Sequence, residues 1–280
     1  MVPHIETYHL FNQLELKATY YPQDTKSVKQ PLIIYLHGGG LIYGNRDDLP
    51  SIYISQFNQA GYPILTLDYP FIPEVRLRDI LSVLKIGIQW ALDHPIIDTD
   101  NYILFGRSAG SYLSLLLASD PTLPNPTQLI SFYGYYSLAD QALQKPSLYY
   151  KKYPAIPFMV LHQLIEKSPL ASSAIAQRFP IYLSYRQTGK WTQEIVGPHA
   201  TLSDFSLSQK DLRQLPPTFI AASDGDQDVP FHCSQDLARF IPENHFHQLT
   251  GLPHDFDSNT HLPEGKEAYN LLIHWLQKRS

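Results

Sequence analysis

The sequence predicts an α/β fold in which helices cover both faces of a mostly parallel sheet of about eight strands. Strand-like and helix-like segments alternate along most of the 280 residues. Several strand-like segments are continuous apolar runs, as expected for strands that are buried on both faces. A strandless stretch of about eighty residues is far longer than an ordinary connection and predicts an inserted cap.

The expected strands begin with a hairpin formed by residues 5–11 and 14–21. Residues 76–92 repeat apolar side chains near the 3.6-residue helical period, and residues 109–118 are small and apolar, which suits a helix packed closely on the sheet. Two further helices are expected at 231–240 and 264–277. The remaining strands are expected at 31–36, 62–68, 101–105, 128–133, 217–222 and 245–250.

The cap is expected to occupy residues 135–213 within a single domain that spans 1–280. This segment is rich in Tyr and Pro and shows helical patterns near 157–167 and 170–178. We interpret it as an insertion that lies over the edge of the sheet. The alternative is a small second domain that is unrelated to the functional site.

Composition narrows the class of protein. Hydrophobic residues make up 44% and charged residues 17%, which is typical of a folded chain. The formal net charge of -5 argues against a nucleic-acid partner. Cys233 is the one cysteine, so no internal disulfide is expected. The first residues lack a signal-peptide pattern, and no apolar run reaches the ~20 residues of a membrane span. We therefore expect a cytoplasmic protein without a membrane partner. A homo-oligomer is compatible with this composition.

Residues 106–110 read Gly-Arg-Ser-Ala-Gly and lie between an expected strand and an expected helix. This context is that of a nucleophile elbow, in which Ser108 projects from a sharp turn. Side chains at Gly106 and Gly110 would collide with the neighbouring chain. The helix that begins at Ala109 directs free N–H groups toward the turn, which favours negative charge there.

Residues 37–40 read His-Gly-Gly-Gly and follow the expected strand 31–36. Backbone N–H groups aimed at a developing oxyanion lower the barrier to acyl transfer by ~3–4 kcal/mol each. We expect Gly39, Gly40 and Ala109 to supply such donors, and His37 to hold the loop by hydrogen bonding. The alternative, a phosphate-binding loop, lacks its characteristic motifs.

These two motifs together resemble the esterase and lipase branch of the α/β-hydrolase superfamily that is related to hormone-sensitive lipase. The resemblance covers most of the chain in element order and implies an α/β-hydrolase fold. The sequence differs from the usual pattern of that branch at Arg107, where an acidic residue is common, and at Ser111, where a second Gly is common.

The order of this fold implies that an acid and then a histidine follow Ser108. Asp226 fits an Asp-x-x-Val-Pro pattern after the strand 217–222, with Asp224 and Asp228 as alternatives. His254 resembles the Gly-His-x-Phe ending of the fold, and His261 is a weaker alternative. We interpret His245 and His247 as strand residues.

The sequence therefore predicts a carboxylesterase that cleaves small esters through an acyl-enzyme on Ser108, with His254 as base and Asp226 as its partner. An amidase, formamidase or peptidase with the same triad, and a non-catalytic binding protein on the same fold, are the alternatives. Tyr43 and Arg107 are the candidate substrate contacts, although an ion pair with a nearby acid is the more ordinary role for Arg107. No metal or cofactor is expected, because the chain has no H-E-x-x-H and no Cys/His ligand set.

Overall fold

The computed structural model of the chain describes residues 2–23, 30–97, 99 and 101–279. In this part of the chain an eight-stranded sheet forms in the order β1-β2-β4-β3-β5-β6-β7-β8. The β1–β2 and β2–β4 pairs are antiparallel, and all other neighbouring strands are parallel, which confirms the expected mostly parallel sheet. The strands are β1 (His4–Phe11), β2 (Leu14–Tyr21), β3 (Leu32–Leu36), β4 (Ile64–Leu67), β5 (Tyr102–Arg107), β6 (Gln128–Phe132), β7 (Thr218–Ser223) and β8 (Asn244–Leu249).

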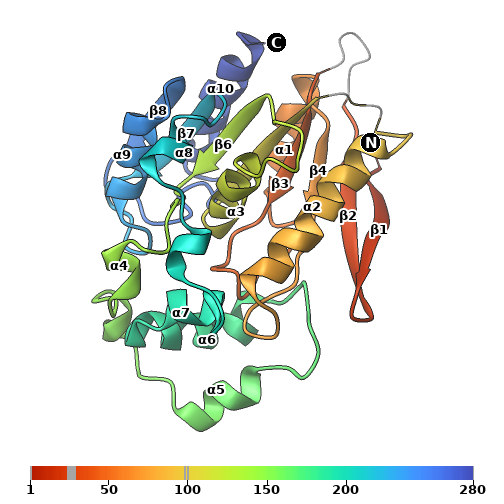
Figure 1. The fold of residues 1–280 in the computed structure, drawn as a ribbon. Coiled ribbons are helices and arrows are strands. Elements are labelled where there is room, and N and C mark those ends of the chain that lie inside the picture. The colour runs from red at the N-terminus through yellow and green to blue at the C-terminus, as the bar shows by residue number, and fades with distance from the viewer. Residues whose placement is uncertain (1, 24–29, 98, 100, 280) are drawn as a thin grey trace.

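Helices cover both faces of this sheet, as expected. One face carries α1 (Ser51–Gln59) and α10 (Pro263–Gln277), and the other carries α2 (Leu77–Asp93), α3 (Ala109–Ala118) and α9 (Phe231–Phe240). In Figure 1, α2 and α3 lie in front of the strands. Side chains of β3 alternate between the two hydrophobic cores, with Ile33 and Tyr35 on one face and Ile34 and Leu36 on the other.

Burial explains why the central strands could be predicted from the sequence. Every residue of β3, β5, β6 and β7 is buried, because helices cover both faces of the central strands. β1 and β8 lie at the two edges of the sheet and are largely exposed or half-buried, so their patterns are more polar.

Among its described residues, the segment between β6 and β7 contains helices, loops and isolated β-bridges, but no strand. Figure 1 shows α5, α6 and α7 gathered at one end of the sheet. Arg178 attaches this segment to the body, because it donates to the carbonyls of Ile42 and Ile72 and forms a buried ion pair with Glu74 at 2.6 Å. The elements are α4 (Gln141–Gln144), η1 (Tyr150–Lys152), α5 (Phe158–Leu164), α6 (Ile175–Thr188), α7 (Trp191–Val196), η2 (Leu202–Phe205) and α8 (Gln209–Leu212).

Helices α6 and α1 differ from the sequence expectation, and the short helices α4, α7 and α8 were not expected either. The pattern near 170–178 predicted a helix too early, since α6 begins at Ile175 and runs through Pro180 to Thr188. Its buried face, which includes Ile181 and Tyr182, extends the helix beyond the local pattern, and Gly189 ends it in the left-handed conformation. Helix α1 was missing from the expectation, although Tyr53 and Phe57 lie one helical turn apart and are both buried.

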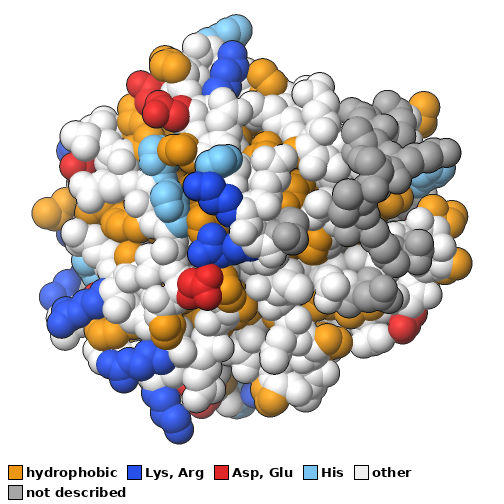
Figure 2. All heavy atoms as spheres, turned by 90° about the horizontal axis from the view of Figure 1, so that it is seen from above, with side chains coloured by type: hydrophobic (Ala, Val, Ile, Leu, Met, Phe, Trp, Pro, Cys, Tyr) orange, Lys and Arg blue, Asp and Glu red, His pale blue; other side chains and the backbone are white. Residues whose placement is uncertain are grey.

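No helix in the described part of the chain is both long and apolar enough to cross a membrane. Seen from above, acidic and basic side chains lie among hydrophobic and uncharged ones, and several basic side chains gather at the lower left of the view (Figure 2).

Candidate active site

Ser108 lies in the turn between β5 and α3, with φ 53° and ψ -120°. This conformation is rare for a residue with a Cβ atom and strains the backbone. The turn is tight enough to require both flanking glycines. A Cβ at Gly106 would lie 2.1 Å from the Gly110 carbonyl carbon, and one at Gly110 would lie 2.0 Å from the Leu36 oxygen. The close approach expected from the sequence is therefore present on both sides of Ser108.

Two other loops bring an imidazole and a carboxylate to Ser108. His254 follows β8, and its Nε2 lies 2.9 Å from the Ser108 Oγ. Asp226 follows β7, and its Oδ2 lies 2.7 Å from the His254 Nδ1. A carboxylate only accepts hydrogen bonds, so in the neutral imidazole Nδ1 carries the proton. Nε2 is then free to accept the Ser108 hydroxyl proton.

The three aspartates after β7 have different partners. Asp226 also accepts the N–H groups of Asp228 and Val229 at 2.8 and 3.0 Å, so both of its oxygens are occupied. Asp224 accepts the Gly251 N–H at 2.7 Å. This bond joins the loop after β7, the acid loop, to the loop after β8, the histidine loop. Asp228 accepts the Tyr182 hydroxyl at 2.7 Å. Only Asp226 bonds to the His254 ring.

Acidic side chains surround the His254 imidazole. Burial lowers the pKa of His254, but the carboxylates of Asp255 and Asp226 outweigh this effect and raise the pKa above 6.5. Asp228 contributes in the same direction, and its Oδ2 lies 3.9 Å from Nε2. The Tyr133 ring packs edge-on against the imidazole with centroids 4.8 Å apart. His261, the alternative base, is exposed, and its backbone N–H donates to the Asn259 side chain.

Hydrogen bonds orient the glycine loop, which is formed by residues 37–40 after β3. The Gly38 carbonyl accepts the His37 Nδ1–H at 2.8 Å and the Tyr69 hydroxyl at 3.1 Å. The Gly39 carbonyl accepts the N–H groups of Ile42 and Tyr43 at 3.0 and 3.1 Å. In a trans peptide the N–H points opposite to the carbonyl, so the Gly39 and Gly40 N–H groups face away from these partners.

Among the described residues, no protein acceptor pairs with the N–H groups of Gly39, Gly40 or Ala109. The loop also lies close to the elbow, because a Cβ at Gly38 would be 3.3 Å from the Ser108 Cβ. Burial lowers the pKa of His37 to about 4, so its ring stays neutral and serves to hold the loop.

Arg107 is buried and paired. Its Nε lies 3.1 Å from Asp257 Oδ2 and donates to the Tyr133 hydroxyl at 2.6 Å. Its Nη2 donates to Ser258 at 2.9 Å. Asp257 is fully buried and also accepts the Tyr269 hydroxyl. Arg107 therefore forms an ion pair with a nearby acid, which is the more ordinary of the two roles considered for it. Sequence reasoning missed Asp257 as the partner, although it lies three residues after His254.

A cavity of about 310 Å³ adjoins the glycine loop. Gly38 and Gly39 form one wall, and Tyr43, Asp48 and Asp255 form others. The edge of Arg107 also borders the cavity. Both residues that the sequence singled out as substrate contacts, Tyr43 and Arg107, therefore face this space.

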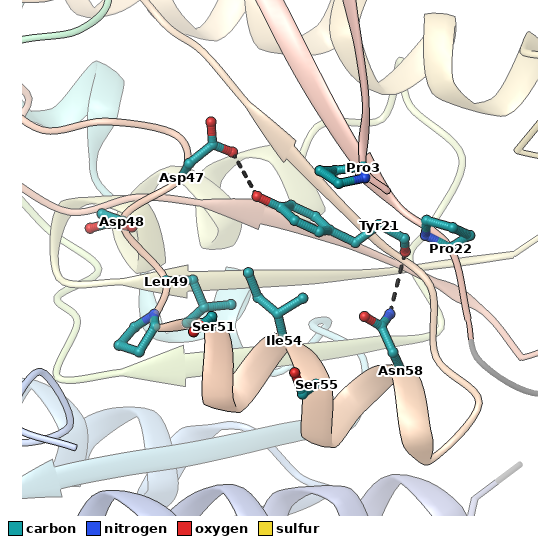
Figure 3. Close-up of a pocket in the computed structure, with 11 residues that line it drawn as sticks. Pro3, Tyr21, Pro22, Asp47, Asp48, Leu49, Ser51, Ile54, Ser55 and Asn58 are labelled. Atoms are coloured by element: carbon teal, nitrogen blue, oxygen red, sulfur yellow. Dashed lines mark hydrogen bonds between the residues drawn. The ribbon is translucent and has the colours of Figure 1, made fainter. Parts of the chain in front are cut away.

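A second cavity, of about 450 Å³, shares Asp48 with the first as a lining residue. Figure 3 shows that Tyr21 forms part of its wall and donates to Asp47, while Asn58 donates to the Tyr21 carbonyl. Among the described residues, none of the expected catalytic residues lines this cavity.

One group of potential metal ligands occurs in the described part of the chain. Asp140, His232 and Cys233 bring their ligand atoms within 4.8 Å of one another. The Asp140 carboxylate already pairs with the His232 ring at 2.7 Å and caps α4 through the Ala142 N–H. Cys233 is buried, and this group does not include any of the residues bonded to Ser108.

The sheet, the strained serine turn and the histidine beside it define the class of α/β hydrolases. Comparison with known proteins supports this class. A sequence profile of the family described as BD-FAE matches residues 18–136. An α/β-hydrolase superfamily protein from Enterococcus faecalis is 31% identical, with 99% of each chain covered and a TM-score of 0.84. The chain belongs to the α/β-hydrolase superfamily.

Other similar proteins differ in how much they share with the chain. A Staphylococcus aureus protein of unknown function is 31% identical, with 98% of each chain covered by the alignment and a TM-score of 0.89. Carboxyl esterase 2 from the fungus Tuber melanosporum shares the fold at 19% identity, with 99% and 87% of the two chains covered and a TM-score of 0.70. A non-reducing polyketide synthase of Penicillium rubens is 30% identical over 52% of this chain, and the match spans only 6% of that much longer protein.

Proposed function

We propose that this hydrolase is a carboxylesterase that cleaves small esters through an acyl-enzyme on Ser108. One observation carries the proposal: the hydroxyl of Ser108, the imidazole of His254 and the carboxylate of Asp226 form a continuous hydrogen-bonded line, at 2.9 and 2.7 Å. Such a line transfers a proton away from a hydroxyl at the moment it attacks a carbonyl carbon.

In the first half of the reaction, the Ser108 Oγ attacks the acyl carbon and His254 Nε2 takes the hydroxyl proton. The tetrahedral intermediate collapses when the ester C–O bond breaks, and the alcohol leaves with the proton from His254. The Asp226 carboxylate keeps Nδ1 protonated and stabilises the imidazolium. Water then attacks the acyl-enzyme, with His254 again as base, and releases the acid and free Ser108.

Negative charge develops on the carbonyl oxygen in both halves. The N–H groups of Gly39, Gly40 and Ala109 have no protein acceptor among the described residues, which supports an oxyanion site there. Each such donor accounts for about 3–4 kcal/mol of barrier lowering. Ala109 adds the positive end of helix α3, which begins at that residue.

The cavity beside the glycine loop supports a small substrate. Its volume of about 310 Å³ lies at the lower end of the range for small-molecule sites, which is about 300–1,000 Å³. Tyr43 and Ile175 supply apolar surface on its wall. We propose that one side of a short-chain ester occupies this space.

The test is turnover by the purified protein of a p-nitrophenyl ester series of increasing acyl length, alongside aryl amides. We expect ester turnover that is highest for short acyl chains, and labelling of Ser108 by a fluorophosphonate. Faster turnover of amides would identify an amidase or peptidase instead. Absence of both labelling and turnover would contradict an enzymatic function.

A further inference from the structure

The corner between α6 and α7 contacts two separate parts of the candidate active site. The Trp191 Nε1–H, at the start of α7, donates to the Gly40 carbonyl at 3.1 Å. The Tyr182 hydroxyl, in α6, donates to Asp228 on the acid loop at 2.7 Å. Both rings are buried, and they pack edge-on against each other with centroids 5.9 Å apart. One aromatic pair thus joins the glycine loop to the acid loop.

The bond from Trp191 holds the Gly40–Leu41 peptide, which follows directly after the Gly40 N–H. On one side of this residue, the preceding peptide is held because the Gly39 carbonyl accepts the N–H groups of Ile42 and Tyr43. On the other side, the only protein donor to the Gly40 carbonyl among the described residues is the Trp191 indole. The Gly40 N–H lies in the first of these two peptides, and the indole bond restrains the second.

Gly40 has few other constraints of its own. Its φ of 60° lies in the left-handed region, and glycine crosses between this region and its neighbours at little cost. A Cβ at this position would lie 2.5 Å from the Tyr182 ring, so the ring also requires a glycine here. Without the indole bond, the Gly40 carbonyl loses its one donor among the described residues, and the backbone at Gly40 is then held only through the Gly39 and Leu41 carbonyls on either side.

The hydrogen bond from Tyr182 to Asp228 affects His254, the proposed base. Asp228 Oδ2 lies 3.9 Å from the His254 Nε2, and its charge raises the pKa of that ring. Tyr182 and the Arg186 Nη2, which donates to the Asp228 carbonyl at 2.8 Å, hold this residue in place. The Asp228 N–H in turn donates to Asp226 at 2.8 Å.

We propose that Trp191 and Tyr182 are positioning residues, and that the cap sets the oxyanion donor and the acid loop through this aromatic corner. The inference rests on the proposed function, since it concerns how fast Ser108 is acylated. Neither side chain takes part in bond making. Trp191 acts through the Gly40 N–H, and Tyr182 acts through Asp228.

The first test is Trp191→Phe, which removes the indole N–H and keeps an aromatic ring. We expect kcat for a short p-nitrophenyl ester to fall at least about tenfold, because a misplaced oxyanion donor loses part of its 10²–10³-fold contribution. KM should stay within about twofold, because the donor acts on the transition state. The acidic limb of the pH profile should not move, because His254 and its neighbours are untouched.

Trp275→Phe is the matched control. Its indole N–H is also buried, but it has no partner among the described residues, and it lies in α10. The two variants lose similar packing, but only Trp191→Phe loses a hydrogen bond. A kcat loss confined to Trp191→Phe supports the proposal. Equal kcat values for Trp191→Phe and the wild-type protein would overturn it.

The second test is Tyr182→Phe. Removing the hydroxyl leaves the Asp228 charge less compensated near Nε2, so the imidazolium gains stability and the pKa of His254 rises. We expect the acidic limb of the kcat/KM profile to move to higher pH, together with a lower kcat. The control is Tyr102→Phe at the start of β5, which loses a partly buried hydrogen bond to the Pro124 carbonyl. An unmoved acidic limb in Tyr182→Phe would contradict the role of Tyr182.

Failure of the inference and of the proposed function give different results. An inactive wild-type protein, or activity that survives Ser108→Ala, contradicts the proposed function. An active wild-type protein that needs Ser108 but tolerates Trp191→Phe contradicts only the positioning role.

Discussion

The Ser108 Oγ lies 2.9 Å from the Nε2 of His254, although 146 residues separate the two along the chain. The two side chains meet because β5 and β8 are parallel strands of one sheet, so the loops that follow them emerge at the same edge. This relationship makes the reaction proposed for the site open to direct tests.

Replacing Ser108 by Ala removes the proposed nucleophile. We expect ester turnover to fall by roughly 10⁴-fold or more, because the remaining machinery cannot form an acyl-enzyme. The variant should keep the circular dichroism spectrum and melting temperature of the wild-type protein within a few degrees, since relief of the strained turn does not disturb the core. Turnover near the wild-type rate would show that another group carries the reaction.

Asn substitutions at the three aspartates after β7 separate their roles. Asp226→Asn should lower kcat by about 10⁴-fold, because the amide no longer holds the required imidazole tautomer. Asp224→Asn should cost mainly stability, about 1–3 kcal/mol by denaturant titration, because it weakens the bond to the Gly251 N–H. A larger kcat loss in Asp224→Asn or Asp228→Asn than in Asp226→Asn would reassign the acid.

The carboxylates around His254 predict an unusual pH dependence. Their charges raise the pKa of this histidine above 6.5, and only the neutral ring accepts a proton from Ser108. Activity should therefore be lost as pH falls, with an acidic limb on the alkaline side of 6.5.

Asp255→Asn tests the cause of that shift. Removing the Asp255 charge withdraws the stabilisation that this carboxylate gives the imidazolium, so the pKa of His254 falls and the acidic limb of kcat/KM moves to lower pH. The exposed Asp93, outside the site, provides a control in Asp93→Asn, whose profile should match the wild-type protein. A limb that stays in place in Asp255→Asn would contradict this electrostatic explanation.

The buried pair of Arg107 and Asp257 should be important for folding. Asp257→Ala leaves the guanidinium without its main partner in the interior, and removal of one member of a buried ion pair costs about 3–5 kcal/mol. We expect a clear fall in the midpoint of urea unfolding. The exposed pair of Arg279 and Glu243 is the comparison, because Glu243→Ala should cost about 1 kcal/mol or less.

The tight turn predicts a sharp contrast between two glycines. Gly110→Ala forces a Cβ to within 2.0 Å of the Leu36 oxygen, where the neighbour is backbone and cannot move aside, so folded protein should be strongly reduced. Gly251→Ala meets no atom within 4 Å, and the cost there is limited to its φ of 70°, about 1–2 kcal/mol. Similar yields and unfolding midpoints for the two variants would show that the elbow tolerates a side chain.

Several features were accessible from sequence because they depend on local patterns. The buried strands β3, β5, β6 and β7 appear as apolar runs, and α3 and α9 were expected with the bounds that they have in the structure. The two glycines of the elbow follow from a motif in its strand and helix context. Helix α6 was harder to predict, because the packing of Ile181 and Tyr182 carries the helix through Pro180 against local preference.

The sequence by itself determined the alternation of strands and helices, and with it the α/β class, because burial on both faces leaves a direct mark on residue type. It also singled out Ser108, since a strained turn imposes its glycines locally. The tertiary structure alone decided which of three aspartates bonds to His254, that Arg107 pairs with Asp257, and that Trp191 and Tyr182 reach the two loops. These contacts join residues far apart in the chain, and their geometry is set by the packing of whole elements, which no short stretch of sequence specifies.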